Sequence, residues 1–158
     1  MSLRTTAALG ALASVCFLGA SVALAEGPVN AGDLKWGPAP PGLPKGAQLA
    51  VVSGNPAGKE PFVIRARMPA GYKIAAHSHP TSEYVTVLSG SLHIGMGDKL
   101  DVKKGAALGP GGFAEAPAGM HHYAWTTKPT VIQVHGQGPF EIVYVNPSDD
   151  PRNKTAAK

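Results

Sequence analysis

Two histidines and a glutamate lie close together in a pattern that could bind a metal ion. His77 and His79 are separated by one residue, and Glu83 follows four residues after His79. On a β-strand, residues i and i+2 point to the same face, so both imidazoles could reach one ion at bonds of about 2.0–2.2 Å. The other interpretation is that these are two ordinary surface histidines near a carboxylate.

The residues between His79 and Glu83 predict how the carboxylate returns to the histidines. Pro80 ends a strand or confines it to a sheet edge, and Thr81 and Ser82 fit a turn. A hairpin at this turn would place Glu83 beside the histidines, at the start of the next strand. A fourth ligand from elsewhere in the chain would favour a metal site over the surface interpretation.

Residues 111–122 end in a histidine that could supply this ligand. They read GGFAEAPAGMHH, in which Pro117 and Gly119 predict a tight turn that leads into a strand with His122 at its start. Neighbouring strand residues point to opposite faces, so His121 should point away from the ion if His122 points toward it.

Together, these two stretches resemble the two sequence motifs of the cupin superfamily. The first motif, G-x5-H-x-H-x3-E-x6-G, matches at Gly71, His77, His79, Glu83 and Gly90. The second motif, G-x5-P-x-G-x2-H-x3-N, matches at Gly111, Pro117, Gly119 and His122. It departs at Thr126, where the family usually has asparagine, but that position is not a metal ligand in the family. The chain therefore resembles a small, secreted, single-domain cupin of the type-2 kind.

The resemblance implies an all-β fold, a cupin-type antiparallel barrel or jelly roll, with one divalent transition metal inside. The ligands that it implies are His77, His79, Glu83 and His122. Three nitrogens and one oxygen suit Fe, Mn, Ni, Cu or Zn and do not choose among them.

The activity that the resemblance implies is metal-dependent chemistry on a small oxygen-bearing molecule, of the dioxygenase (oxidoreductase) or isomerase kind. The alternative is a non-catalytic module that binds or senses a metal or a small ligand. No residue is assigned a catalytic role, and the substrate is not identified.

Four further residues could line the pocket around the ion. Gln133 and His135 share one face of a late strand, which in cupins often lines the pocket mouth; otherwise they form a polar pair on the rim. Arg65 alternates with apolar residues, so it faces either solvent, which is favoured, or the cavity, where it would suit an anionic substrate. Met120 shares the strand parity of His122 and could form an apolar wall.

Short apolar runs separated by turns fill residues 48–145, which predicts the strands of one all-β barrel or sandwich. The expected strands are QLAVVS, FVIRARM, YKIAAH, EYVTVL, SLHIGM, KLDVKK, FAEAP, HHYAWTT, TVIQVHG and FEIVYV. No window favours an amphipathic helix. Residues 146–158 form a polar C-terminal tail.

Residues 1–25 are typical of a secretory signal peptide. Arg4 precedes an apolar stretch that ends in an A-x-A cleavage pattern at residues 23–25. The alternatives are an uncleaved membrane anchor or a lipoprotein modified at Cys16, which the bulky Val15 disfavours. We therefore expect a periplasmic or secreted protein without a stable membrane anchor after cleavage. Cys16 is the only cysteine, so the cleaved chain would have no disulfide and no thiolate ligand.

Residues 26–47 are rich in proline and glycine and predict an extended arm. Trp36 is its one large apolar residue, so we expect the arm to pack on the barrel rather than to form a flexible linker. Tyr123 and Trp125 share the outward parity of His121 and should pack against this arm or against a partner subunit. The arm could also cross to a neighbour in a homodimer.

The charge pattern bears on the kind of partner. The formal net charge is +4, and the basic residues are scattered rather than clustered with aromatic residues. This pattern favours a small-molecule ligand and indicates no nucleic-acid partner.

Overall fold

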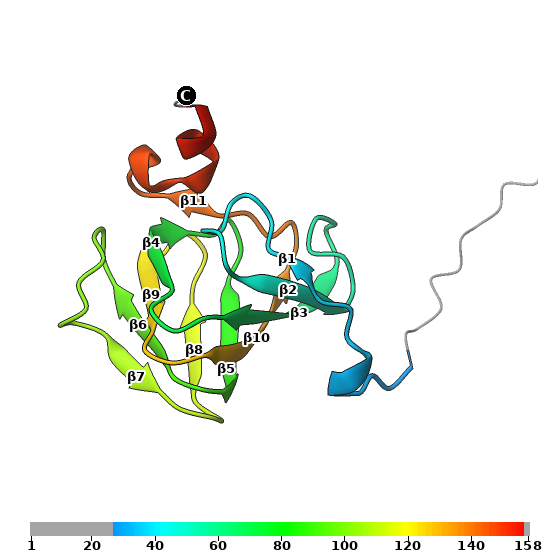
Figure 1. The fold of residues 1–158 in the computed structure, drawn as a ribbon. Coiled ribbons are helices and arrows are strands. Elements are labelled where there is room, and N and C mark those ends of the chain that lie inside the picture. The colour runs from blue at the N-terminus through cyan, green and yellow to red at the C-terminus, as the bar shows by residue number, and fades with distance from the viewer. Residues whose placement is uncertain (1–26, 157–158) are drawn as a thin grey trace, which may run out of the picture.

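Two antiparallel β-sheets packed face to face form a jelly roll (Figure 1). The computed structural model describes residues 27–156, and the predicted signal peptide lies outside them. The strands are β1 (Gly37–Pro38), β2 (Gln48–Ser53), β3 (Pro61–Met68), β4 (Lys73–Ser78), β5 (Glu83–Ser89), β6 (Leu92–Met96), β7 (Ala106–Leu108), β8 (Phe113–Ala116), β9 (His122–Thr126), β10 (Thr130–Gln137) and β11 (Val143–Tyr144). One sheet has the order β1-β2-β3-β10-β5-β8, and the other has the order β11-β4-β9-β6-β7. The all-β prediction is confirmed.

Helical structure in the described residues is limited to short 3-10 segments. They are η1 (Ala31–Asp33), η2 (Pro147–Asp149) and η3 (Pro151–Ala156). Within residues 27–156, no helix has the length and apolar character needed to cross a membrane.

Two of the expected strands differ from the structure. The run KLDVKK forms a turn, because the Asp101 side chain and carbonyl accept the backbone N–H groups of Lys103 and Lys104. The strand that follows is β7, within a stretch that the sequence predicted as a turn. The run FEIVYV gives only the two-residue β11, because its first residues turn across one end of the barrel, where the Phe140 N–H donates to the Pro56 carbonyl.

The main core fills the space between the two sheets. In β3, the apolar residues alternate inward and the two arginines outward, as the period of a strand requires. The buried members of this core come from both sheets and include Phe62, Ile64, Met68, Val85, Val87, Leu92, Ile132 and Val134. Each such side chain contributes about 1.5–3 kcal/mol on burial, so this alternation fixes which strand face lies inside.

A second, smaller core lies on the outer face of the β4–β9–β6 sheet. Tyr123 and Trp125 are buried there, but neither the arm nor a partner is needed to cover them, which corrects the sequence prediction. Their cover is the chain's own β6–β7 loop, where the Tyr123 hydroxyl donates to the Asp101 carbonyl at 3.3 Å. Gly105 lets the loop approach, since a Cβ atom there would lie 2.2 Å from the Trp125 ring.

The N-terminal arm packs on the barrel, as predicted. Its β1 forms the edge of one sheet and pairs with β2, which in turn pairs with β3. The Arg67 guanidinium lies 3.8 Å from the centre of the Trp36 ring, a cation–π contact. The rest of the arm, in cyan, runs to the end of the barrel where β11 lies (Figure 1).

Thr126, the position that departs from the cupin motif, secures the turn before β4. Its side chain is almost fully buried, donates to the Pro69 carbonyl at 2.6 Å and accepts from the Tyr72 N–H at 3.1 Å. A threonine hydroxyl can make both bonds at once, so the departure from asparagine leaves the turn intact.

We expect Thr126→Val to lower the free energy of unfolding by about 1–3 kcal/mol, because valine keeps the shape but removes both hydroxyl bonds and leaves the Tyr72 N–H and the Pro69 carbonyl only their long mutual bond of 3.4 Å. Urea unfolding followed by tryptophan fluorescence measures the change. Thr86→Val, on the half-exposed outer face of β5, is the matched control and should change stability by less than about 0.5 kcal/mol. Similar losses in both variants would contradict this role of Thr126.

Candidate metal centre

The four ligands proposed from the sequence converge between the two sheets. His77 is the second-last residue of β4 and His122 begins β9 in one sheet, whereas Glu83 begins β5 in the other. His79 lies in the link between β4 and β5. One ring nitrogen from each histidine lies within 4.8 Å of the others. The Glu83 Oε2 atom lies 3.4 Å from the His79 Nε2 and 3.2 Å from the His122 Nε2.

The link between His79 and Glu83 is not the predicted hairpin. Its flanking strands, β4 and β5, belong to different sheets, so residues 79–82 cross from one sheet to the other. The ligands still meet, because each sheet directs its inner side chains into the space that the two sheets share. The predicted strand end before Pro80 and the strand start at Glu83 are both confirmed.

A β-bulge in β4 turns His77 into the cavity. The pairing of β4 with β9 shifts register between Ile74 and His77, so His77 lies opposite His122. Ile74 and His77 both face the cavity although three positions separate them. A bulge inserts one extra residue into a strand. Without it, the alternation of a regular strand would place Ile74 and His77 on opposite faces.

Backbone carbonyls fix which ring nitrogen of each histidine is free. The Nδ1 atoms of His77, His79 and His122 lie 2.7, 2.7 and 3.1 Å from the carbonyls of Ala75, Glu141 and Met120. A carbonyl only accepts, so each Nδ1 must carry the proton and each Nε2 must present a lone pair. This is the second contact that metal-binding histidines usually make.

The Nε2 lone pairs of His79 and His122 face another group that can only accept a hydrogen bond. The buried Nε2 atoms of His79 and His122 have no hydrogen-bond partner of good geometry within the described residues. Their nearest polar neighbour is the Glu83 carboxylate, which also presents lone pairs. Buried acceptors at this spacing repel one another unless a proton or a metal cation lies between them. The donor set therefore fits a divalent cation.

Electrostatics in the metal-free protein follow from the same contacts. Burial alone would raise the pKa of Glu83, but the adjacent His122 and His79 hold it well below its ordinary value. Burial would lower the pKa of His122, yet the Glu83 carboxylate raises it. Burial, together with the charges of His122 and His79, lowers the pKa of His77 to about 3.

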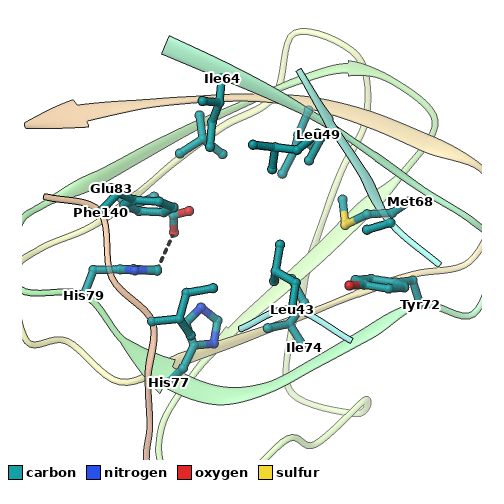
Figure 2. A pocket seen from close by; sticks show the side chains of 15 residues that line it. Leu43, Leu49, Ile64, Met68, Tyr72, Ile74, His77, His79, Glu83 and Phe140 are labelled. Carbon is teal, nitrogen blue, oxygen red and sulfur yellow. Dashed lines mark ion pairs between the residues drawn. The ribbon is translucent and has the colours of Figure 1, made fainter. Parts of the chain in front are cut away.

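A small apolar cavity, here named the inner cavity, adjoins the candidate ligands. Its volume is about 60 Å³. Figure 2 shows His77, His79 and Glu83 at one end and Met68 and Tyr72 at the other. Other lining residues are mainly aliphatic: Leu43, Leu49, Ile64, Ile74, Ile132, Val134 and Ile142. Apart from the candidate ligands and Tyr72, the lining is therefore apolar.

Three of the predicted pocket residues lie on the opposite side of their sheet. Arg65 pairs with Gln133 across β3 and β10, and its Nε donates to the Gln133 Oε1 at 3.1 Å. His135 stacks on Tyr84 with ring centres 5.0 Å apart, also on the outer face. The prediction that Arg65, Gln133 and His135 line the pocket is wrong, because their apolar neighbours in β3 and β10 face the cavity instead. The solvent-facing alternative for Arg65 is confirmed.

Met120 is not a pocket wall either. Its side chain is 40% exposed in the turn before β9, and its contribution to the site is the carbonyl that accepts from His122. Gly119, which has φ of 74°, lets the same turn donate a backbone N–H to the His79 carbonyl at 2.9 Å. His121 points away, as predicted, with its Nδ1 2.6 Å from Asp98 on the surface.

The segment around Phe140 supports the site and was not predicted to do so. The Phe140 ring stacks on His79 at 4.4 Å and contacts Phe62 at 5.0 Å, while the next carbonyl, of Glu141, orients His79. An apolar run near the end of a domain looks like any other strand in the sequence. No spacing relates it to a histidine that lies 61 residues earlier.

Two packed antiparallel sheets with a buried histidine and carboxylate cluster at one end of the barrel define the class as a cupin-like double-stranded β-helix. The Cupin domain family matches residues 64–146, more than half of the chain, and the chain belongs to this family.

Solved structures share this fold. The polyketide cyclase RemF from Streptomyces resistomycificus aligns with a TM-score of 0.64 and 21% identity over 82% of this chain and 92% of that chain. An RmlC-like cupin from Ralstonia eutropha JMP134 aligns with a TM-score of 0.60 and 16% identity, over 78% of this chain and 74% of that chain. KdgF from Halomonas sp. aligns with a TM-score of 0.53 and 19% identity, over 69% of this chain and 93% of that chain. No curated protein matches the chain.

We expect His77 in the metal-free protein to stay neutral down to about pH 4, with its proton on Nδ1, because its pKa lies well below the ordinary value of about 6.5. Long-range ¹H–¹⁵N correlation spectra recorded from pH 7 downward measure both properties. The same chain in urea is the reference, in which His77 should gain its second proton near pH 6.5. Protonation of His77 near that value in the folded protein would contradict the burial and the tautomer described above.

Proposed function

We propose that this protein is a metal-dependent cupin enzyme that acts on a small oxygen-bearing molecule. Its ligands would be His77, His79, Glu83 and His122. The observation that carries the proposal is the set of Nε2 lone pairs, two of them without a hydrogen-bond partner, that face the buried Glu83 carboxylate. A cation would satisfy all of these groups at once, and three nitrogens with one oxygen suit Fe, Mn, Ni, Cu or Zn.

A bound ion of this kind supplies Lewis-acid chemistry or, if it is redox-active, dioxygen chemistry. The protein's own residues hold and enclose the reacting centre. Backbone carbonyls keep the imidazoles in one tautomer and one orientation, and Phe140 and Ile64 keep water away from them. The aliphatic wall favours a ligand whose only polar part is the oxygen-bearing group.

The polar groups in the inner cavity favour an oxidoreductase over an isomerase. An isomerase that moves protons needs a separate acid and base within reach of its substrate. Among the described lining residues, Glu83 is the one carboxylate, and it serves as a candidate ligand. The Tyr72 hydroxyl donates to a carbonyl, and burial, together with the nearby Tyr144, raises its pKa. Chemistry supplied by the ion itself is therefore the better-supported class.

The relatives of known structure do not choose the reaction. One is described as a polyketide cyclase, but at 21% identity its likeness concerns the fold. Secretion to the periplasm or beyond stays a prediction, as does a homodimer.

We expect the protein from metal-replete expression to contain about one equivalent of a first-row divalent metal, measured by plasma mass spectrometry after dialysis. His122→Ala should lower the affinity for that metal by at least about 100-fold, because it removes a ligand nitrogen. His121→Ala is the matched control and should leave the affinity unchanged, since that ring pairs with Asp98 on the surface. Metal-free protein, or equal losses in the two variants, would contradict the proposed centre.

Turnover distinguishes the enzyme from the alternative binding or sensing module. We expect the metal-loaded protein to consume oxygen with at least one compound from a set of catechol-like and acidic small molecules, measured with an oxygen electrode. His122→Ala should abolish this uptake and His121→Ala should retain it. Tight binding of the same compounds without uptake would favour the binding module.

A further inference from the structure

A second, larger hollow lies directly outside the inner cavity. This outer pocket has a volume of about 610 Å³ and is enclosed by the arm, the loop before β3 and residues 140–142. Five side chains line both the outer pocket and the inner cavity: Leu43, Leu49, Ile64, Phe140 and Ile142. One layer of side chains therefore separates the outer pocket from the candidate metal ligands.

Of these five residues, Leu43 has the backbone that is least restrained by its surroundings. Leu49 and Ile64 belong to the paired strands β2 and β3. Phe140 and Ile142 flank the carbonyl that orients His79. Leu43 instead belongs to the irregular part of the arm between β1 and β2. Residues 40–46, here named the strap, can therefore move without breaking a strand pairing.

Two tyrosine hydroxyls hold the strap over the cavity. The Tyr144 hydroxyl donates to the Gly42 carbonyl at 2.9 Å, and the Tyr72 hydroxyl donates to the Pro44 carbonyl at 2.6 Å. These carbonyls lie on either side of Leu43. Both donors stay protonated at neutral pH, since burial raises the pKa of Tyr144 to about 12 and that of Tyr72 further.

The inner cavity alone is too small for most small-molecule ligands. The inner cavity, at about 60 Å³, is well below the roughly 150 Å³ of an apolar cavity that binds benzene. The outer pocket falls within the range of about 300–1,000 Å³ that small-molecule sites occupy. A molecule larger than a few atoms can reach the candidate ligands only if this layer of side chains opens and the two spaces join, and Leu43 is the member of the layer that the strap carries.

We propose that the outer pocket and the inner cavity form one binding site for a ligand with an oxygen-bearing, metal-binding head and an apolar body, and that Leu43 controls the passage between them. The head would lie at the histidines and the body in the outer pocket. The proposal deepens the proposed function, on which the role of the head rests. The apolar body follows from a wall that is mainly proline, leucine, isoleucine and phenylalanine. Of its two charged residues, Glu141 is exposed and Arg152 pairs with Asp150 at 2.8 Å.

Hydroxamates of two sizes test the joined site, because they share one oxygen head and differ in body. Acetohydroxamate and benzohydroxamate are titrated into the cobalt-loaded protein and followed by its visible absorption. We expect Leu43→Ala to raise the affinity for benzohydroxamate by about tenfold and Leu43→Trp to lower it by about as much. Acetohydroxamate should change by less than about threefold in both variants.

Leu88→Ala is the matched control, since Leu88 is an exposed leucine of β5 that lines neither space. It should leave both hydroxamate affinities unchanged. If the Leu43 variants change the affinities for both hydroxamates equally, or change neither, Leu43 does not govern the passage between the two spaces. Equal effects of Leu88→Ala would lead to the same conclusion.

Hydrogen exchange tests the strap without any metal, so a failure of the metal site and a failure of the strap are distinguishable. The Leu43 N–H donates to the Pro40 carbonyl at 2.9 Å and reports opening of the strap. In the metal-free protein, Tyr72→Phe and Tyr144→Phe should each speed exchange of the strap peptide by about fivefold. The β3 peptide is the internal control and should not change. Unchanged strap exchange in both variants, or equal acceleration in β3, would overturn the proposal.

Discussion

The central constraint in this protein is a buried repulsion that a positive charge must relieve. The Glu83 carboxylate faces the Nε2 atoms of His79 and His122 at 3.4 and 3.2 Å, within a space that excludes water. Each histidine has already committed its Nδ1 proton to a backbone carbonyl, so it has no proton left to offer toward Glu83. An apolar core of this kind holds such groups only if a cation or an extra proton joins them.

Backbone geometry imposes this arrangement more than side-chain packing does. The bulge in β4 sets His77 opposite His122, and the Gly119 N–H ties the turn before β9 to His79. The carbonyl of Glu141, nearly at the end of the barrel, then orients His79 from a third direction. The site is thus assembled from segments in both sheets and cannot form before the sheets pack.

Local patterns in the sequence predicted the all-β class and the grouping of His77, His79 and Glu83, because strand parity is a local property. The resemblance to the two cupin motifs added the distant His122. The predicted hairpin between His79 and Glu83 was wrong. A hairpin and a crossover between sheets need the same turn residues, so the sequence did not distinguish them. The bulge and the role of Phe140 depend on pairing between distant segments, which no local spacing records. In β10, polar residues suggested a pocket wall at Gln133 and His135, but burial of Ile132 and Val134 decided which face turned inward.

The same constraint explains why the arm belongs to the site. A charged centre in an apolar cavity is strong only while water is kept away, since charge interactions weaken several-fold as the surroundings become more polar. One layer of five side chains separates the outer pocket from the candidate ligands, and two tyrosine hydroxyls hold the strap that carries one of them, Leu43. An aliphatic closure can exclude water and still yield to an apolar ligand, whereas a charged one would compete for the ion. The proline-rich arm therefore helps to enclose the candidate metal centre.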